Sequence, residues 1–225
     1  MTAAIVILNH NTAELARECV LAAKDCPYDY IIIVDNASSD SSREVLGELA
    51  GGKITFLKTD NRGYSAGNNI GARYAADVLK ADVIFISNPD VRCPADTVKA
   101  ILSKFAANPV PGIVTGVVWD ALVKDGPKVY KYFAYKVPSY WDMLFDCFPV
   151  SFVFRFRVLR NTIYYYAKDV HEKGCIQSEC VSGCFFAISA QAYKAIGGFD
   201  EGTFLYGARK EFWGSASGKR ASKFW

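Results

Sequence analysis

The sequence predicts an α/β protein built on a mostly parallel sheet that is flanked by helices. Two observations lead to this fold class. Short apolar runs rich in β-branched residues alternate, along the first half of the chain, with longer segments of helical periodicity. The runs are also apolar at consecutive positions, and a strand that is apolar on both sides must be covered on both sides, as strands of parallel sheets are.

Five strands are expected from such runs. Each is short and apolar and is bounded by polar or glycine-containing turns, which is the pattern of a buried strand. Their sequences are AIVIL (4–8), YIIIV (30–34), ITFLK (54–58), VIFIS (83–87) and GIVTGVV (112–118).

Helices are expected between these strands. Asn11 followed by Glu14 has the capping pattern of a helix start, and Ser41 followed by Glu44 repeats it for a second helix that ends at Gly51-Gly52. The apolar face predicted for the first helix consists of Leu15, Cys19 and Ala22. The remaining expected elements are helices over 66–79 and 94–105, a strand over 184–189 and a short helix over 190–196.

Polar residues follow the first four predicted strands. The clusters are NHN (9–11), DN (35–36), DNRG (60–63) and NPD (88–90). Each cluster alone is explained by the preference of Asn, Asp, Pro and Gly for turns. In a parallel sheet, however, ligands bind at the carboxyl ends of the strands, where all four clusters would meet. The sequence therefore predicts a polar ligand site along one rim of the sheet.

The common nucleotide-binding motifs are absent. A dinucleotide fold needs G-x-G-x-x-G in the first strand-to-helix turn, which here reads NHNTAE, and the chain contains no P-loop sequence. Glycines instead recur at every fourth position, at Gly63, Gly67 and Gly71. For Gly67 and Gly71, close packing of a helix on the sheet and direct contact with a ligand are equally open interpretations.

Composition and charge limit the function classes. The chain has 225 residues, of which 51% are hydrophobic and 22% charged, and its formal net charge of +3 is too small to argue for nucleic-acid binding. No window reaches the uncharged apolar length of a membrane-spanning helix, and Met1 is followed by a strand-like run rather than by a signal peptide. Seven cysteines, an odd number, fit reduced thiols, so we expect a cytoplasmic protein.

One group of residues has the chemistry of a zinc site. His171, Cys175, Cys180 and Cys184 supply four candidate ligands, but they lack the paired Cys-x-x-Cys turns that bring sulfurs together. Buried thiols are therefore the better interpretation of these cysteines.

Four motifs in order resemble those of a known family. They are VDNASSD (34–40), NRGYSAGNNIGARYA (61–75), SNPDV (87–91) and SGCFFAISAQAYKAIGGFDEGTFLYG (182–207). Together they resemble family 2 glycosyltransferases of the rhamnosyltransferase-like kind, whose GT-A fold is Rossmann-like. The resemblance covers residues 3–118 and 178–207, and it rests on the four motifs in this order rather than on any one of them.

The resemblance implies a donor site on the predicted rim. Asp90 matches the final acid of a D-x-D-like motif that holds a divalent cation, Mg²⁺ or Mn²⁺, against the diphosphate of a nucleotide-sugar. Asn88 stands where many relatives have the first Asp, and Asp35 would hold the base or the ribose. The residues implied to bind the nucleotide-sugar are Asn9, His10, Asp35, Asn61, Arg62, Gly63, Asn88 and Asp90, with Asp90 as the metal ligand.

The resemblance also implies an acceptor side. Asp200 and Glu201 follow Gly197-Gly198 in a segment that, in relatives, leads to acids facing the acceptor hydroxyl. A carboxylate there takes the proton as the hydroxyl attacks the anomeric carbon, which inverts that centre. For both acids, a structural role in the turn that ends the helix is equally open.

The function implied is that of an inverting glycosyltransferase. The donor would be a nucleotide-diphosphate-sugar, with deoxythymidine diphosphate rhamnose as one candidate, and the acceptor a cell-surface glycan or a lipid-linked precursor in polysaccharide biosynthesis. One alternative is a non-catalytic domain that binds nucleotide-sugars. A sugar nucleotidyltransferase is less favoured, because NHNTAE lacks the basic, glycine-rich loop that such an enzyme needs after the first strand.

A single glycosyltransferase domain is predicted over residues 1–225. Its parts are a nucleotide-sugar-binding half (1–118), an insertion dense in aromatic and basic residues (119–175), an acceptor-side element (176–207) and an atypical tail (208–225). Aromatic rings beside Arg and Lys predict a peripheral contact of the insertion with the inner face of a membrane. A packed insertion or a subunit contact is an equal alternative.

The tail departs from the family pattern directly after Gly207. Relatives usually continue with a pair of acids, one of them the expected catalytic base, and here the two positions hold Ala208 and Arg209. A resemblance that stops so sharply predicts a shifted reading frame, a truncation or an artificial end. The chain is therefore expected to bind donor but to transfer sugar poorly.

Overall fold

The described part of the chain falls into two compact units. The computed structural model describes residues 1–107, 110–120, 128–129, 134–135, 174–178, 180–202 and 204. The first unit takes in the described residues within Met1–Gly116 and Gly183–Ser222, and the second those within Val117–Ser182. Most of the predicted insertion (119–175), with its membrane contact, and all of the tail (208–225) lie outside the described residues.

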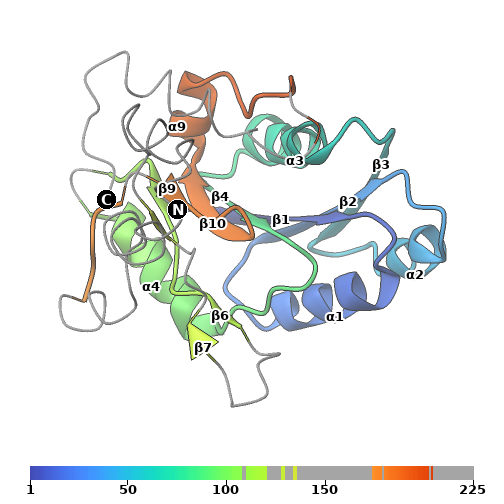
Figure 1. Cartoon of the computed structure of the whole chain (residues 1–225), viewed down its shortest axis with the longest axis horizontal. Helices are drawn as coiled ribbons and strands as arrows, with labels where there is room; N and C mark the ends of the chain where they lie inside the picture. The colour runs from blue at the N-terminus through green and yellow to red at the C-terminus, as the bar shows by residue number, and fades with distance from the viewer. Residues whose placement is uncertain are drawn as a thin grey trace, which may run out of the picture. The chain divides into compact units, whose positions relative to one another are not determined.

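A six-stranded sheet forms the centre of the first unit (Figure 1). Its order is β3-β2-β1-β4-β10-β5. The strands are β1 (Ala3–Asn9), β2 (Tyr30–Asn36), β3 (Ile54–Thr59), β4 (Val83–Ser87), β5 (Ile113–Val114) and β10 (Phe185–Ser189). The strands β1, β2, β3 and β4 are parallel to one another, whereas β10 is antiparallel to both β4 and β5. The predicted α/β class with a mostly parallel sheet is confirmed.

The place of β10 in the sheet differs from what chain order suggests. Its residues pair with β4 from Phe185 opposite Ser87 to Ser189 opposite Val83. The run 112–118, predicted as a longer strand, contributes only β5, which pairs with β10 at the edge. Burial explains why β10, and not the run 112–118, lies next to β4. FFAIS is buried throughout and suits a central strand, whereas both residues of β5 are only half-buried.

The helices of the first unit lie close to the predicted positions. They are α1 (Ala13–Lys24), α2 (Ser42–Gly47), α3 (Tyr64–Arg73) continued by a π-helical turn η1 (Tyr74–Val78), α4 (Ala95–Phe105) and α9 (Ala190–Ala195). Pro94 is the N-cap of α4 rather than part of its first turn. α2 ends at Gly47, short of the predicted end at Gly51-Gly52.

The predicted capping boxes do not form. Asn11 has a left-handed backbone with φ of 55° and lies outside α1, whose N-cap is Thr12. The side chain of Asn11 is instead engaged with the next loop, where its Oδ1 accepts a hydrogen bond from Ser39 N at 2.7 Å. Ser41 is the N-cap of α2 as predicted, but its side chain makes no capping hydrogen bond.

The buried face of α1 differs from the predicted one. Cys19 is buried, but the side chain of Leu15 is 45% exposed and Ala22 is only partly buried. The buried residues of α1 are Ala13, Ala16, Cys19, Val20 and Ala23. Because most of these side chains are small, the helix can lie close to the sheet with the larger Leu15 left outside.

Helices cover both faces of the sheet. Figure 1 shows α1 and α2 on one side of the strands and α3 on the other. Successive residues of a strand face opposite ways, so Ile5 and Ile7 of β1 join the core formed with α1, α2 and α4, while Val6 and Leu8 lie under α3. This double cover explains why the strands are apolar at consecutive positions.

The glycines of α3 pack against the sheet. A Cβ atom added at Gly67 would lie 2.5 Å from Leu8 Cδ1, and one added at Gly71 would lie 2.3 Å from Val6 Cγ1. Close approach of the helix therefore accounts for both residues, which favours packing over ligand contact. Gly63, the N-cap of α3, has φ of 96° and faces the carbonyl of Phe204.

Cys19, Cys26, Cys93 and Cys175 are free thiols. Cys19, Cys26 and Cys180 are buried, Cys93 and Cys184 are half-buried, and Cys175 is exposed. Among the described residues, no group of three or more His, Cys, Asp or Glu could hold a metal ion, and His171 of the zinc candidate lies outside them. Over the same residues, no helix combines the length and apolarity that crossing a membrane requires.

The second unit is described at a few short strands. β6 (Trp119–Asp120) pairs with β7 (Lys128–Val129), and β8 (Ala134–Tyr135) pairs with β9 (Cys180–Val181), both antiparallel. The candidate site described next lies entirely in the first unit.

Candidate functional site

Strand register brings the predicted polar clusters to one edge of the sheet. The pairs are Asn9 with Asp35, Asn36 with Thr59, and Ile7 with Ser87. Because these strands are parallel, the segments that follow them leave the sheet on the same side. We call this edge the rim, and it consists of residues 9–12, 35–40, 60–63 and 88–90.

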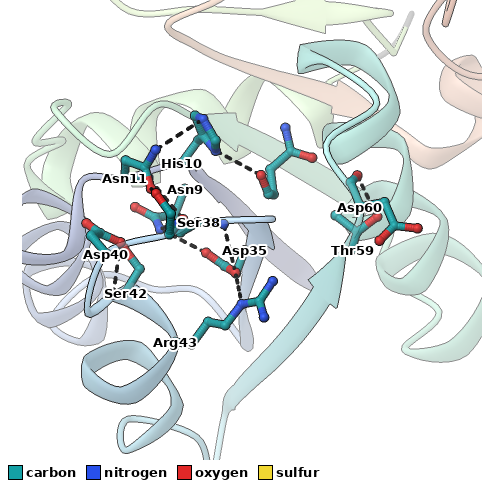
Figure 2. Close-up of polar contacts among 12 residues, drawn as sticks. Asn9, His10, Asn11, Asp35, Ser38, Asp40, Ser42, Arg43, Thr59 and Asp60 are labelled. Carbon is teal, nitrogen blue, oxygen red and sulfur yellow. Dashed lines mark hydrogen bonds and ion pairs between the residues drawn. The ribbon is translucent and has the colours of Figure 1, made fainter.

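Asp35 is fully buried and organises the first part of the rim. Its Oδ1 accepts a hydrogen bond from Asn9 Nδ2 at 3.2 Å, and its Oδ2 accepts one from Ser38 N at 3.3 Å. Oδ2 also pairs at 3.2 Å with Nε of Arg43, whose side chain is 51% exposed (Figure 2). A buried carboxylate needs such donors, because without them its desolvation is not compensated.

Side-chain hydrogen bonds join the segments that follow β1 and β2. Ser38 Oγ accepts from Asn11 N at 2.9 Å and from Asn9 Nδ2 at 3.1 Å, contacts that Figure 2 places beside Asp35. Asn11 and Ala37 both have left-handed backbones, with φ of 55° and 56°. The hydrogen bonds therefore hold two conformations that are uncommon for residues other than glycine.

His10 is exposed on the rim and its ring is held in one tautomer. Its Nδ1 lies 2.9 Å from the carbonyl oxygen of Asn36, and its Nε2 lies 3.3 Å from Asn11 Nδ2. Because a carbonyl only accepts, Nδ1 carries the proton, and Nε2 then accepts from the Asn11 amide. The ring thus links the first two rim segments.

Asn36 connects the second rim segment to the third. Its Nδ2 donates to Asn61 Oδ1 at 3.1 Å and to the Gly63 carbonyl at 3.5 Å. Asn61 Oδ1 also accepts from Gly63 N at 3.2 Å, which tightens the turn before α3. Asn36 Oδ1 is buried and has no hydrogen-bond partner within the described part of the chain.

Asn88, Pro89 and Asp90 form a turn at the end of β4. Asn88 N donates to the Cys184 carbonyl at 2.8 Å, and Val91 N donates to the Asn88 carbonyl at 3.3 Å. Asp90 is exposed, and no described residue hydrogen-bonds or ion-pairs with its carboxylate. The polar cluster that ends β4 therefore presents an uncompensated acid to solvent at the rim.

These residues fit a cation that arrives with a diphosphate. Mg²⁺ is usually bound by one or two carboxylates together with substrate phosphates and water rather than by a complete protein cage. The exposed carboxylate of Asp90 and the amide oxygen of Asn88 supply oxygen ligands of that kind.

Glu201 lies beside the rim and has three partners. Its Oε1 accepts from Asn69 Nδ2 at 2.7 Å and from Arg73 Nη2 at 2.9 Å, and its Oε2 pairs with Arg62 Nη2 at 3.3 Å. The hydrogen bond from Asn69, followed by the charges of Arg73 and Arg62, lowers the pKa of the Glu201 carboxyl. A lowered pKa makes a carboxylate a weaker proton acceptor.

Asp200 has fewer partners than Glu201. It is half-buried, and its Oδ1 accepts from Gly202 N at 2.8 Å in a local turn. Among the predicted site residues, Arg62 and Glu201 are in direct contact. Asn9 and Asp35 are also in direct contact, whereas Asp90 and Asp200 make no described contact with the other predicted site residues.

Sequence reasoning missed several residues of the site. They are Ser38, Arg43, Asn69 and Arg73, while Asn36 was expected on the rim but given no role of its own. Asn36 and Ser38 stand inside VDNASSD, and Asn69 and Arg73 stand inside NRGYSAGNNIGARYA, so both motifs contained the signal. Which side chains meet, however, depends on backbone turns that the motifs do not specify.

Solved structures show which class of fold this is. The chain superposes on the crystal structure of GalNAc-T7 with UDP, GalNAc and Mn²⁺ with a TM-score of 0.64 and 15% identity, over 94% of this chain and 39% of that one. It superposes on the crystal structure of S. aureus TarS 1–349 with a TM-score of 0.56 and 11% identity, over 96% of this chain and 55% of that one. The shared fold, with its mostly parallel sheet flanked by helices, is the GT-A fold of glycosyltransferases.

The chain belongs to glycosyl transferase family 2, whose family model matches residues 4–196. A curated relative, the low-salt glycan biosynthesis hexosyltransferase Agl10 of Haloferax volcanii, is 28% identical over 98 residues. That alignment covers 43% of this chain and 30% of the relative, so the chain spans a minor part of the relative's length. The family expected from the four motifs is confirmed.

Proposed function

We propose that the chain binds a nucleotide-diphosphate-sugar at the rim and transfers its sugar, with inversion, to a glycan or a lipid-linked acceptor. The observation that carries the proposal is the exposed carboxylate of Asp90, which pairs with no described residue, on the same rim as the organised segments of Asn9 and Asp35. Family membership and the hexosyltransferase relative support the same class of reaction. Deoxythymidine diphosphate rhamnose is one candidate donor.

Different rim residues would bind different parts of the donor. Asp35, with Asn9 and His10, would bind the nucleoside, and Asn61 to Gly63 would lie along the nucleotide. Asp90 and Asn88 would hold a divalent cation, which when bound neutralises charge on the diphosphate. The GalNAc-T7 structure contains UDP and Mn²⁺, which supports this division for a protein of the same fold.

The transfer step needs a proton acceptor on the acceptor side. The acceptor oxygen bonds to the anomeric carbon, the bond from that carbon to the diphosphate oxygen breaks, and the hydroxyl proton passes to a carboxylate. Of the two predicted acids, Asp200 is the better candidate. Glu201 is bound by three nitrogen donors that lower its pKa, and these contacts favour a role in holding the structure.

Removing the Asp90 carboxylate tests the donor site. The wild-type chain is titrated calorimetrically with UDP, dTDP and GDP, each with and without Mn²⁺. In the Asp90→Asn variant we expect the diphosphate bound in Mn²⁺ to lose about tenfold in affinity, because the protein's charged ligand to the cation is gone. Without metal, the affinity should be unchanged. Asp90 lies on an exposed turn, so the fold should persist.

Asp96→Asn is the matched control, because Asp96 is an exposed acid on α4 whose one described ion pair is with Lys99. An Asp90→Asn variant with unchanged Mn²⁺ dependence would refute the metal assignment. A transfer assay with the selected donor then separates the two function classes. Binding without turnover would support either the non-catalytic binding domain or the poor transfer expected from the atypical tail (208–225).

A further inference from the structure

An ion-pair cluster links the rim to the acceptor-side segment. Arg62, in the rim turn after β3, and Arg73, on the last turn of α3, both bind the carboxylate of Glu201. The side chains of Arg62 and Arg73 are 69% and 53% exposed, whereas that of Glu201 is 25% exposed. The carboxylate is thus the enclosed member of the cluster, and Arg62 is its most exposed member.

Glu201 is anchored by Asn69. The buried amide of Asn69 donates from Nδ2 to Glu201 Oε1 at 2.7 Å and to the Phe199 carbonyl at 2.9 Å. Its Oδ1 accepts from Phe199 N and from the hydroxyl of Tyr193, both at 2.9 Å. Asn69 therefore fixes both the backbone that leads to Glu201 and one oxygen of its carboxylate.

The backbone of Arg62 is fixed as well. Arg62 N donates to the Asp60 carbonyl at 2.9 Å, and the next residue, Gly63, donates to Asn61 Oδ1 at 3.2 Å. After the turn, Tyr64 N donates to the Phe204 carbonyl at 2.8 Å. The long side chain of Arg62 is therefore flexible only between two fixed ends, its own backbone and Glu201.

The cluster carries an excess of positive charge. Two guanidinium groups share one carboxylate, and Arg73 already compensates the Oε1 side. A guanidinium has about five N–H donors, and Arg62 uses one of its terminal nitrogens on Glu201, so donors remain for another anion. Arg62 can therefore bind a phosphate while it stays paired with Glu201.

We propose that Glu201 is a positioning residue that holds the Arg62 guanidinium ready for the diphosphate of the donor. This inference rests on the proposed function, because it takes the ligand to be a nucleoside diphosphate. An arginine restricted to one arrangement before binding loses less side-chain entropy when the diphosphate arrives. The role assigned to Glu201 here replaces the proton transfer implied by the family resemblance.

Glu201→Gln isolates the contact with Arg62. The amide oxygen of the new side chain is expected to face Asn69 and Arg73, since both are donors, which keeps the segment anchored. Its NH₂ group then faces Arg62, which cannot accept a hydrogen bond. The variant therefore loses the Arg62 contact while it retains the hydrogen bonds that hold the fold.

The test compares UDP with uridine, or dTDP with thymidine, according to the base selected in the donor titration. Calorimetry at about 0.15 M salt limits long-range charge effects. We expect Arg62→Ala to weaken diphosphate binding about tenfold and Glu201→Gln about threefold to tenfold, with nucleoside affinity unchanged. In the double variant, Glu201→Gln should add no further loss, because its effect passes through Arg62.

Arg73→Ala is the matched control, because it removes the other guanidinium from Glu201 and leaves Arg62 in place. Equal losses in Arg73→Ala and Glu201→Gln, or losses that extend to the nucleoside, would mean that Glu201 only stabilises the segment. Tighter diphosphate binding by Glu201→Gln would mean that Glu201 competes for Arg62. Unchanged binding by Arg62→Ala, an exposed residue whose loss the fold should tolerate, also overturns the proposal.

Failure of the proposed function has a different signature. In that case the wild-type chain binds none of the nucleoside diphosphates, with or without Mn²⁺, and the role of Arg62 falls with it. If the wild-type chain binds a nucleoside diphosphate, the comparison of the Arg62, Glu201 and Arg73 variants alone decides whether Glu201 positions Arg62.

Discussion

Ala37 is the residue at which the rim carries unfavourable backbone geometry. Its φ of 56° places a side chain in the left-handed region, which costs about 1–2 kcal/mol for residues other than glycine. The neighbours on both sides impose this turn, because Asn36 and Ser38 each make side-chain hydrogen bonds to another rim segment. The rim is thus organised at the expense of local stability.

Ala37→Gly should stabilise the protein. Glycine removes the steric cost of the left-handed backbone but loses more entropy on folding, so we expect a net gain of about 0.5–1 kcal/mol in the free energy of unfolding. Urea denaturation followed by circular dichroism measures it. Ala50→Gly is the control, because Ala50 is exposed and lacks a positive φ, and it should be destabilising. A loss of stability in Ala37→Gly would mean that the turn is unstrained.

The rim around Ala37 shows which parts of the site the sequence could predict and which it could not. Asn9 and Asp35 were placed on one rim because strand ends of a parallel sheet meet there, and the register confirms that they do. The contacts of Ser38 could not be predicted, since they require the left-handed turn at Ala37, and alanine gives no signal for such a turn.

The α3 helix shows at the scale of elements how close packing depends on glycine. Gly71 faces Val6 and Gly67 faces Leu8, and in both cases an added Cβ would overlap a side chain of β1. The spacing of these glycines was visible in the sequence, but the sequence did not show whether they serve helix packing or ligand contact. The predicted caps at Asn11 and Ser41 failed for a related reason, because tertiary contacts decided where those side chains bind.

Gly71→Ala should be more destabilising than Gly67→Ala. The added methyl at Gly71 meets the stiff, β-branched side chain of Val6 at 2.3 Å, whereas the atom met at Gly67 is the mobile end of Leu8 at 2.5 Å. We expect Gly71→Ala to cost about 1–3 kcal/mol, which exceeds the roughly 1 kcal/mol that alanine gains over glycine in a helix. Urea unfolding of both variants gives the comparison.

Gly47→Ala serves as the control for this pair. Gly47 ends α2, and a Cβ there would make only ordinary contacts with Phe56 at 3.8 Å, so this variant should be close to neutral. Equal stability of Gly71→Ala and Gly47→Ala would contradict the close approach of α3 to β1.

At the scale of the whole molecule, the sheet is completed by a strand from late in the chain. The parallel part, β3-β2-β1-β4, follows from the alternation of strands and helices, which is why the fold class could be predicted. The position of β10 could not, because pairing between distant segments leaves no local signal. Sequence alone predicts a strand over residues 112–118 but gives no strand order, whereas the structure places Phe185–Ser189 between β4 and the edge strand β5.

A fragment of residues 1–118 should not fold cooperatively. Without β10, the outer edge of β4 and side chains such as Phe85 lose their cover, although they are fully buried in the complete chain. We expect the fragment to aggregate or to lack a sharp urea transition by circular dichroism, while the full chain shows one. A peptide of residues 183–204 should partly restore structure by strand addition. Cooperative unfolding of the fragment alone would show that β10 is dispensable.

The late position of β10 in the chain also has a consequence for co-translational folding. The first four strands leave the exit tunnel well before Phe185–Ser189 has been translated, so the nascent chain must carry an unfinished sheet with β4 at its open edge. Synthesis runs at about 5–20 residues per second, which leaves seconds in which another chain can pair with that edge. Expression yield should therefore depend on chaperones that shield nascent strands, and it should do so more strongly than the stability of the finished fold would suggest.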